Sequence, residues 1–393
     1  MYNNSEIGII VHSYLIIFVH FKVDIYKEIL ILLELPFWYN RSEETKLRSV
    51  WKMKISEKAN ELIQKLMEKH PHTLLTIGTL NKSETSYKLF DKTGEIPYES
   101  HLYEIGSIGK TFTTSLLAKY INEGKMSLDD TVAKYISELD DVQYYPSLKR
   151  LATHTAGYPE DYELQYDLRL TGKLLWKYYI KREQPIIQDN MTVNKEKLIR
   201  FAKKRKLKDE DYPWIYSNFG ISLLGLALSN VAKKDFMTTM TEFIQHDLKL
   251  KNTYVGVNYD QLVQGYDLKN QEIIPWFVPK DNQFIPSGGG MLANSEDLLE
   301  YARLNLAETP EYLTIAHEYH APRGENVSNF MGLGWWGDTQ EKIFGHGGNT
   351  SGFATYLLFS KEKDFAVVIL ANISDYEERE PLGNAVLSEN WKN

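Results

Sequence analysis

Residues 104–112 read EIGSIGKTF, and the spacing of their polar side chains suits two different chemistries. Gly109, Lys110 and Thr111 match the end of a phosphate-binding loop, in which a lysine and a hydroxyl group follow glycine-rich backbone. Ser107 and Lys110, three residues apart, match a serine nucleophile with its own lysine base. The surrounding residues decide between these two interpretations.

The phosphate-binding interpretation fails on the residues that precede the lysine. Such a loop requires glycine five residues before Gly109, where this chain has Glu104, and a carboxylate there would repel phosphate. The strand-to-helix elbow of lipases fails as well, because it requires glycine two residues before the serine and Ile105 stands there. Neither motif explains this stretch.

A serine–lysine pair fits the physical chemistry of a helix that begins at Ser107. Residues three apart project from the same side of a helix, so Ser107 and Lys110 can share a proton. The partial positive charge of a helix N-terminus favours a developing serine alkoxide. Together with burial, it disfavours the charged form of the lysine, which must be neutral to act as a base. The tetrad alone is weak evidence, since Ser360 and Lys363 repeat it in a predicted hairpin turn.

Two further clusters carry groups that complete this chemistry. Tyr216 and Asn218 precede an apolar helical run, and His346 and Gly348 lie at the end of a predicted strand. A tyrosine hydroxyl could relay a proton between nucleophile and leaving group, and an asparagine amide could orient a substrate amide or the lysine. Glycine beside a strand lets the substrate backbone approach, and an exposed N–H there could donate to an oxyanion.

In this order, Ser-x-x-Lys at 107–110, Tyr-x-Asn at 216–218 and His-x-Gly at 346–348 resemble the three motifs of the serine β-lactamase and penicillin-binding-protein superfamily. The resemblance is to its class C-like branch, which includes class C β-lactamases, D-alanyl-D-alanine carboxypeptidases, D-amino-acid peptidases and esterases. It covers roughly residues 55–380 and implies a β-lactamase/transpeptidase-like fold. Flanking stretches that also fit are 151–159, 287–306, 331–336 and 345–360.

The resemblance implies a role for each matching residue. Ser107 is the implied nucleophile, which becomes acylated, and Lys110 is its base or proton partner. Tyr216 would assist proton transfer in acylation and deacylation, while Asn218 holds the substrate. His346 would lie opposite the nucleophile, on the strand that lines the cleft.

The third motif departs from the pattern of class C β-lactamases, which have Lys-Thr-Gly where this chain has His346, Gly347 and Gly348. The resemblance assigns the oxyanion hole to the backbone N–H groups of Ser107 and Asn349. The missing threonine hydroxyl would have bound a substrate carboxylate, and histidine near neutral pH is only partly cationic. We therefore expect a D-amino-acid peptidase or carboxypeptidase, or an esterase. A true β-lactamase and a non-catalytic penicillin-binding-type protein on the same fold are the alternatives.

The elements that must hold these groups follow from the hydrophobic pattern. We predict an α+β fold whose antiparallel sheet is assembled from N- and C-terminal segments, is flanked by helices and has an inserted helical region. The predicted elements are an amphipathic helix at 53–70, strands within 72–80 and 86–100, a mostly buried helix at 107–123, a helix-rich and loop-rich region from 125 to 330, strands within 341–348 and 353–372, and a closing helix.

Composition excludes several classes of partner. The chain has 393 residues, a net charge of −8 and no cysteine. An acidic balance offers no basic field to nucleic acid, and a chain without cysteine has no disulfides and no thiolate metal sites. His317 and His320 lack the spacing of a helical zinc pair, and His154 is expected to fix a turn. We therefore expect no metal, no cofactor, and a small molecule or short peptide as substrate.

The first fifty residues lie outside this pattern. Residues 7–21 are strongly apolar but shorter than a membrane span, and the flanking charges suit neither a signal peptide nor a regular anchor. We divide the chain into an N-terminal appendage, 1–52, which is an atypical membrane anchor or a non-native extension, and a hydrolase domain, 53–393. Membrane association through 7–21 implies a cell-envelope protein, whereas a chain that effectively begins near Met53 implies a cytoplasmic one.

Overall fold

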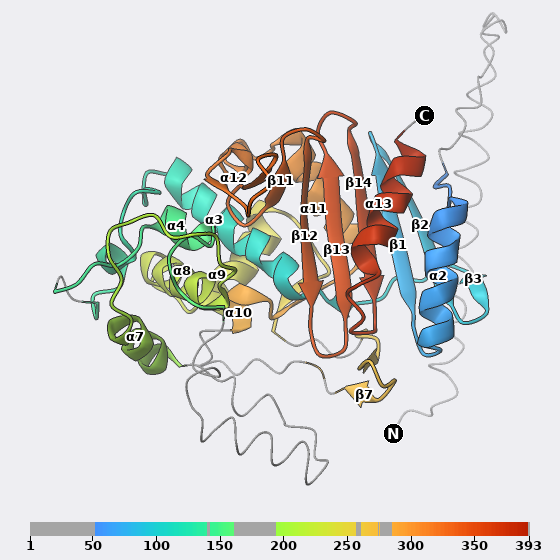
Figure 1. Ribbon diagram of the computed structural model, residues 1–393, viewed down its shortest axis with the longest axis horizontal. Helices are drawn as coiled ribbons and strands as arrows, with labels where there is room; N and C mark the ends of the chain where they lie inside the picture. The colour runs from blue at the N-terminus through green and yellow to red at the C-terminus, as the bar shows by residue number, and fades with distance from the viewer. Residues whose placement is uncertain are drawn as a thin grey trace, which may run out of the picture. The chain divides into compact units, whose positions relative to one another are not determined.

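The computed structural model describes residues 52–139, 142–160, 194–256, 261–273, 275 and 285–391 (Figure 1). The apolar run 7–21 and nearly all of the predicted appendage 1–52 lie outside these residues. All described residues belong to one compact unit, Trp51–Asn393. Within it, none of the described helices combines the length and the apolar character that crossing a bilayer requires.

A nine-stranded antiparallel sheet forms the centre of this unit and joins segments from both ends of the described chain (Figure 1). β1 pairs with β14 along its whole length, from Leu75 opposite Ala371 to Asn81 opposite Phe365. The α+β prediction, with a sheet built from N- and C-terminal segments, is therefore confirmed. In spatial order the strands are β3 (Gly94–Ile96), β2 (Glu84–Asp91), β1 (Leu75–Asn81), β14 (Phe365–Ala371), β13 (Ala354–Ser360), β12 (Ile343–Asn349), β11 (Trp336–Asp338), β10 (Asn329–Met331) and β9 (Ala321–Pro322).

Helices cover both faces of the sheet. α2 (Glu57–Lys69) and α13 (Arg379–Asn390) pack on one face, and α11 (Ser295–Ala307) packs on the other (Figure 1). Every residue of β13 and β14 is consequently buried, which explains why their sequences are apolar almost without interruption. Ser56 caps α2 by accepting the N–H of Ala59 at 3.1 Å, so this helix begins later than the sequence predicts.

The helix predicted at 107–123 also begins later, and it is buried on all sides. A 3₁₀ turn, η1 (Gly106–Ile108), leads into α3 (Gly109–Asn122). Because neighbouring elements surround α3, its threonine hydroxyls are buried and bond to protein carbonyls. Thr113 donates to Ser287 at 2.8 Å, and Thr114 donates to Leu333 at 2.7 Å. These bonds hold α3, and the turn before it, in a fixed place.

The region that follows α3 is rich in helices, and it also contributes short strands. Its other described helices are α4 (Leu148–Ala152), α7 (Lys195–Lys204), α8 (Asn218–Ala232), α9 (Phe236–Glu242), α10 (Ile285–Gly288) and α12 (Leu313–His317). A small antiparallel sheet is formed by β4 (Tyr103–Glu104), β8 (Met291–Ala293) and β5 (Thr253–Val255), and a separate pair by β6 (Gly265–Tyr266) and β7 (Glu272–Ile273). Strands of two or three residues are too short to give a periodic pattern, so the sequence did not reveal them. β4 leads directly into η1 and thereby positions the chain before the predicted nucleophile.

Candidate active site

Ser107 lies in the tight turn η1, where close packing against β12 fixes the backbone. Gly106 has a φ of +51°, and a side chain there would place its Cβ 2.7 Å from the backbone nitrogen of Asn349. Both the conformation and the available space therefore require glycine. Ser107 is partly exposed, whereas Gly106 and Ile108 on either side of it are buried. The turn thus leaves the serine accessible to a substrate.

Lys110 has no exposed surface, and its amine is bonded to the serine. Its Nζ donates to Ser107 Oγ at 2.9 Å and also to the carbonyl of Gly288. The same Nζ lies 5.0 Å from the centre of the Tyr216 ring. A buried amine in hydrogen-bond contact with a serine oxygen is the arrangement that serine activation by lysine requires. The structure therefore brings together the two residues of the first motif.

Tyr216 and Asn218, from the second motif, flank the start of α8. Ser217 between them is the N-cap of α8 and accepts a backbone N–H through its side chain, and Asn218 is the first helical residue. Tyr216 lies next to Lys110 on one side and His154 on the other, with 4.6 Å between the Tyr216 and His154 ring centres. Both Tyr216 and Asn218 are partly exposed. The segment therefore places the Tyr216 phenol and the Asn218 amide at the N-terminal end of α8, where the Tyr216 ring lies beside Lys110.

His154 holds the Tyr216 segment through two hydrogen bonds and one ring contact. Its backbone, with a φ of +61°, accepts the N–H of Ile215 at 2.9 Å, and its Nδ1 accepts the N–H of Ser217 at 3.1 Å. Burial is the main cause that lowers the pKa of His154 to about 3, and Lys110 adds to the shift when its amine is protonated. The ring is therefore neutral, with its proton on Nε2. We expected this residue only to fix a turn, and the structure places it directly against Tyr216.

His346 is completely buried in β12, and its ring stacks on Trp336 with 4.4 Å between ring centres. Its Nδ1 bonds to the carbonyl of Gly347 at 2.7 Å, which assigns the proton to that nitrogen. Burial is the main cause that holds the pKa of His346 well below its ordinary value, and Lys110 adds to the shift when its amine is protonated. Its ring centre lies 6.3 Å from that of Tyr216. At neutral pH His346 is therefore neutral, which corrects the expectation of a partly cationic histidine.

The end of β12 packs against η1 and brings the second expected oxyanion donor to the site. A Cβ on Gly348 would overlap the carbonyl of Ile105, to which Thr355 Oγ1 donates at 2.9 Å. Asn349 is exposed, and its backbone nitrogen lies beside Gly106. The two backbone N–H groups expected to hold an oxyanion thus come from adjoining segments, η1 and the end of β12.

A guanidinium group from α13 fills the space beside Gly347. A Cβ at this position would lie 2.6 Å from Arg379 Nη2, and Arg379 Nη1 donates to the carbonyl of Gly348 at 2.8 Å. Burial lowers the pKa of Arg379, but arginine starts so high that the group remains a cation. The third motif therefore has a positive charge beside it, supplied by α13 rather than by position 346.

Arg379 and His154 were not among the predicted site residues. For Arg379 a signal was present, because a cation as the first residue of a helix opposes the helix dipole. Local conflicts of this kind are expected at functional sites. For His154 the sequence offers no comparable signal, since its contacts with the Tyr216 segment depend on tertiary structure.

The Ser-x-x-Lys sequence at 360–363 forms no serine–lysine pair. Ser360 is buried at the end of β13, and its Oγ accepts the backbone N–H of Lys363 at 3.4 Å. The Lys363 amine instead pairs with Glu362 at 3.2 Å. Of the tetrads at 107–110 and 360–363, only the first has the geometry of a nucleophile and its base.

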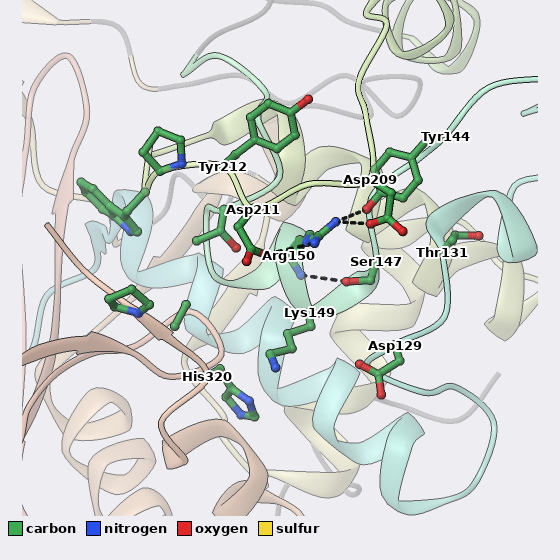
Figure 2. Close-up of a pocket in the computed structure, with 15 residues that line it drawn as sticks. Asp129, Thr131, Tyr144, Ser147, Lys149, Arg150, Asp209, Asp211, Tyr212 and His320 are labelled. Carbon is green, nitrogen blue, oxygen red and sulfur yellow. Dashed lines mark hydrogen bonds and ion pairs between the residues drawn. The ribbon is translucent and has the colours of Figure 1, made fainter.

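A pocket of about 540 Å³ lies near the Tyr216 segment but contains none of the predicted site residues (Figure 2). Trp214 belongs to its wall, and Arg150 projects into it. Arg150 is already paired with Asp209 at 2.8 Å and Asp211 at 3.1 Å, and it also bonds to the Tyr144 hydroxyl. Arg150, the cation that projects into this pocket, is thus already paired with two carboxylates. We therefore place the candidate active site at Ser107 and not in this pocket.

Curated proteins related to this chain match most of its length at low identity. Protein flp of Staphylococcus aureus (strain MW2) is 24% identical over an alignment of 289 residues that covers 69% of this chain and 53% of that protein. The chain therefore spans about half the length of the flp relatives that it matches. A protein named beta-lactamase from Providencia stuartii is 26% identical over an alignment of 367 residues that covers 80% of this chain and 86% of that protein.

Solved structures share the fold over most of the chain. A beta-lactamase/D-alanine carboxypeptidase from Pseudomonas syringae superimposes with a TM-score of 0.67 at 21% identity, covering 84% of this chain and 98% of that one. A class C beta-lactamase from Rhodobacter sphaeroides gives a TM-score of 0.66 at 20% identity, covering 86% and 99%. The fold is thus the β-lactamase/transpeptidase fold. The family model described as beta-lactamase matches residues 60–389, which include all three motifs, and the chain belongs to the beta-lactamase family.

Proposed function

We propose that this protein is a serine hydrolase that forms an acyl-enzyme on Ser107. The observation that carries the proposal is the 2.9 Å hydrogen bond from Lys110 Nζ to Ser107 Oγ, made by a lysine with no exposed surface. Burying a charged amine costs on the order of several kcal/mol. A structural role alone therefore does not account for a lysine at this buried position. A buried amine that takes up the serine proton does account for it.

Acylation then follows from the groups around the serine. With Lys110 neutral, Ser107 Oγ attacks the substrate carbonyl carbon, and the serine proton passes to Lys110. The carbonyl oxygen becomes an oxyanion, to which the N–H groups of Ser107 and Asn349 donate. The bond to the leaving group breaks as the Tyr216 hydroxyl gives its proton to the leaving atom, and Lys110 returns a proton to Tyr216.

Deacylation uses the same groups in the reverse direction. A water molecule gives a proton towards Tyr216 and Lys110 as its oxygen attacks the acyl carbon. The ester bond to Ser107 breaks, the serine oxygen regains a proton, and the acid product leaves. Lys110 Nζ lies 5.0 Å from the Tyr216 ring centre, which supports a proton path between the two side chains.

Neutral histidines support this division of roles. Both His154 and His346 have a lowered pKa because they are buried, so neither ring is a cation near neutral pH. Proton transfer is therefore left to Lys110, which is bonded to Ser107, and to Tyr216, whose ring lies beside Lys110. His346 is buried and neutral, so it does not supply the charge that a lysine in its place would supply.

We infer that the substrate is a D-amino-acid peptide or an ester rather than a β-lactam. The third motif lacks both the lysine and the threonine of class C β-lactamases, and the space of the threonine side chain is taken by Arg379. Asn218, at the start of α8, is suited to hold a substrate amide. One structure with this fold is described as a beta-lactamase/D-alanine carboxypeptidase, which is consistent with a peptide substrate.

Labelling and turnover test the proposal together. A fluorophosphonate probe should label the wild type but not Ser107→Ala, and p-nitrophenyl butyrate or a D-Ala-D-Ala peptide should be hydrolysed faster than nitrocefin. Efficient nitrocefin turnover would indicate a true β-lactamase. Labelling by a fluorescent penicillin without turnover of any substrate would indicate a binding protein. Absence of Ser107-dependent labelling with both probes would contradict an acyl-enzyme.

A further inference from the structure

The segment 194–208 is strongly basic, in contrast to the chain as a whole. Its residues include eight lysines and arginines and one glutamate, a net charge of +7, whereas the whole chain has a net charge of −8. The segment forms the helix α7 and the four residues after it. A local excess of positive charge of this size attracts anionic partners, even when the protein carries a net negative charge.

The helix α7 uses all of its apolar side chains inside the protein. Leu198, Ile199, Phe201 and Ala202 are buried, and the Phe201 ring packs against that of Phe219 in α8 with 4.6 Å between ring centres. The other six residues of α7 are all charged. Figure 1 shows α7 at the edge of the compact unit, on the side of α8 away from the central sheet. The face that α7 turns outwards is therefore purely ionic.

Most of the positive charge on this surface is not neutralised by neighbouring carboxylates. Five of its cations are exposed: Arg200, Lys204, Arg205, Lys206 and Lys208. Within the described part of the chain, none of these five forms an ion pair with a carboxylate. Of the three acidic residues that follow the segment, Asp209 and Asp211 are already paired with Arg150, at 2.8 and 3.1 Å. The cations thus remain available to an external anion.

The chemistry of the face favours an anionic lipid bilayer over a nucleic acid. It has neither the aromatic rings nor the amide side chains with which proteins stack on bases or read their edges. A bilayer asks only for positive charge, and each lysine or arginine near its surface raises the partition coefficient by about fivefold. The sequence also carries an apolar run at 7–21, and a weak apolar signal together with a polybasic surface gives membrane binding that neither provides alone.

We propose that residues 195–208 form a docking surface for a bilayer that contains anionic phospholipids. Docking orients the enzyme, because Phe201 of α7 contacts Phe219, which directly follows Asn218 of the second motif. The second motif therefore lies about one helix thickness, roughly 10 Å, from the docking surface. The inference goes beyond the proposed acyl-enzyme chemistry and does not depend on it, since Ser107 belongs to another element.

The test measures cosedimentation of the full-length protein with vesicles of phosphatidylcholine, alone or mixed with phosphatidylglycerol. The wild type should bind the mixed vesicles much more tightly, and added salt should release it because salt screens exposed charges. Replacing three exposed cations together, Arg200→Gln, Lys204→Gln and Lys208→Gln, should lower the partition coefficient by about a hundredfold. The charge-conserving triple variant Arg200→Lys, Lys204→Arg and Lys208→Arg should bind as the wild type does.

A matched control removes the same charge from exposed lysines on other elements. Lys58→Gln, Lys92→Gln and Lys251→Gln together should leave binding unchanged. Equal losses in the two Gln triple variants, or equal wild-type binding to both kinds of vesicle, would overturn the inference. Tighter binding of duplex DNA than of mixed vesicles would overturn it in favour of a nucleic-acid partner. If thermal unfolding shows that the α7 triple variant is not folded, Lys204→Gln alone decides, with an expected loss of about fivefold. Failure of the wild type to label at Ser107 would sink the proposed function and leave vesicle binding unaffected.

Discussion

The ring of His154 lies 4.6 Å from the ring of Tyr216, and His154 also holds the residues on both sides of that tyrosine. Its carbonyl accepts the N–H of Ile215, and its Nδ1 accepts the N–H of Ser217. Tyr216 itself lies in neither a helix nor a strand, so these contacts fix its ring beside Lys110. In the proposed mechanism His154 is therefore a positioning residue that acts through Tyr216.

Replacing His154 should reduce turnover more than substrate binding. His154→Ala removes the acceptor for the Ser217 N–H and forces a left-handed backbone on alanine, so we expect Tyr216 to shift. A shift near 1 Å costs about a hundredfold in kcat. His154→Asn should retain more activity, because asparagine tolerates this conformation and has a short acceptor. Both are measured as kcat and KM with p-nitrophenyl butyrate, per Ser107 labelled by fluorophosphonate. Wild-type kcat in both variants would rule out a positioning role.

The same residue should make stability depend on pH. The pKa of His154 is about 3 in the folded protein and near the ordinary 6.5 in the unfolded chain, so between these values the unfolded chain binds more protons. Stability from the neutral ring is therefore complete above pH 6.5 and is lost as the pH falls below it. At pH 5 the loss is about 2 kcal/mol. Urea unfolding at pH 7 and pH 5 should show this extra loss in the wild type relative to His154→Asn, and equal losses would contradict it.

Sequence could predict the parts of the site that depend on local geometry. The spacing of Ser107 and Lys110 brings them together because they lie within one turn, and the apolar runs of β1, β13 and β14 identify strands of the central sheet. The contact of Arg379 with Gly347, by contrast, joins a helix to a strand through tertiary packing. Nothing in either segment identifies its partner.

The burial of α3 exposes a second limit of the hydrophobic pattern. Its polar residues Thr113 and Thr114 suggest an exposed face, yet each hydroxyl donates to a carbonyl of another segment and both residues are buried. A hydroxyl satisfied in this way is compatible with a core position. The pattern of apolar residues therefore underestimates how completely the helix that carries Lys110 is enclosed.

Lys110→Met should abolish activity without lowering stability. Methionine fills the buried space without an ionisable group. The cost of burying the Lys110 amine, whether as an ammonium or after deprotonation, is on the order of several kcal/mol. Removing it should outweigh the cost of about 1–3 kcal/mol for the Gly288 carbonyl that loses its donor. The rate of fluorophosphonate labelling at Ser107 should fall by about a thousandfold, which is typical for loss of a general base. Thermal unfolding and labelling kinetics measure the two effects. A lower melting temperature with unchanged labelling would give Lys110 a structural role instead.

A side chain at position 347 should compete with Arg379 for space. In Gly347→Thr the new Cβ lies 2.6 Å from Arg379 Nη2, so the guanidinium must move and give up its bond to the Gly348 carbonyl. We expect a destabilisation of about 1–3 kcal/mol, typical of overpacking. Adding Arg379→Ala removes the clash, so a double-mutant cycle from urea unfolding should give a coupling of at least about 1 kcal/mol that favours the double variant. Strictly additive effects would mean that the guanidinium yields freely, and Arg379 would then be no fixed part of the third motif.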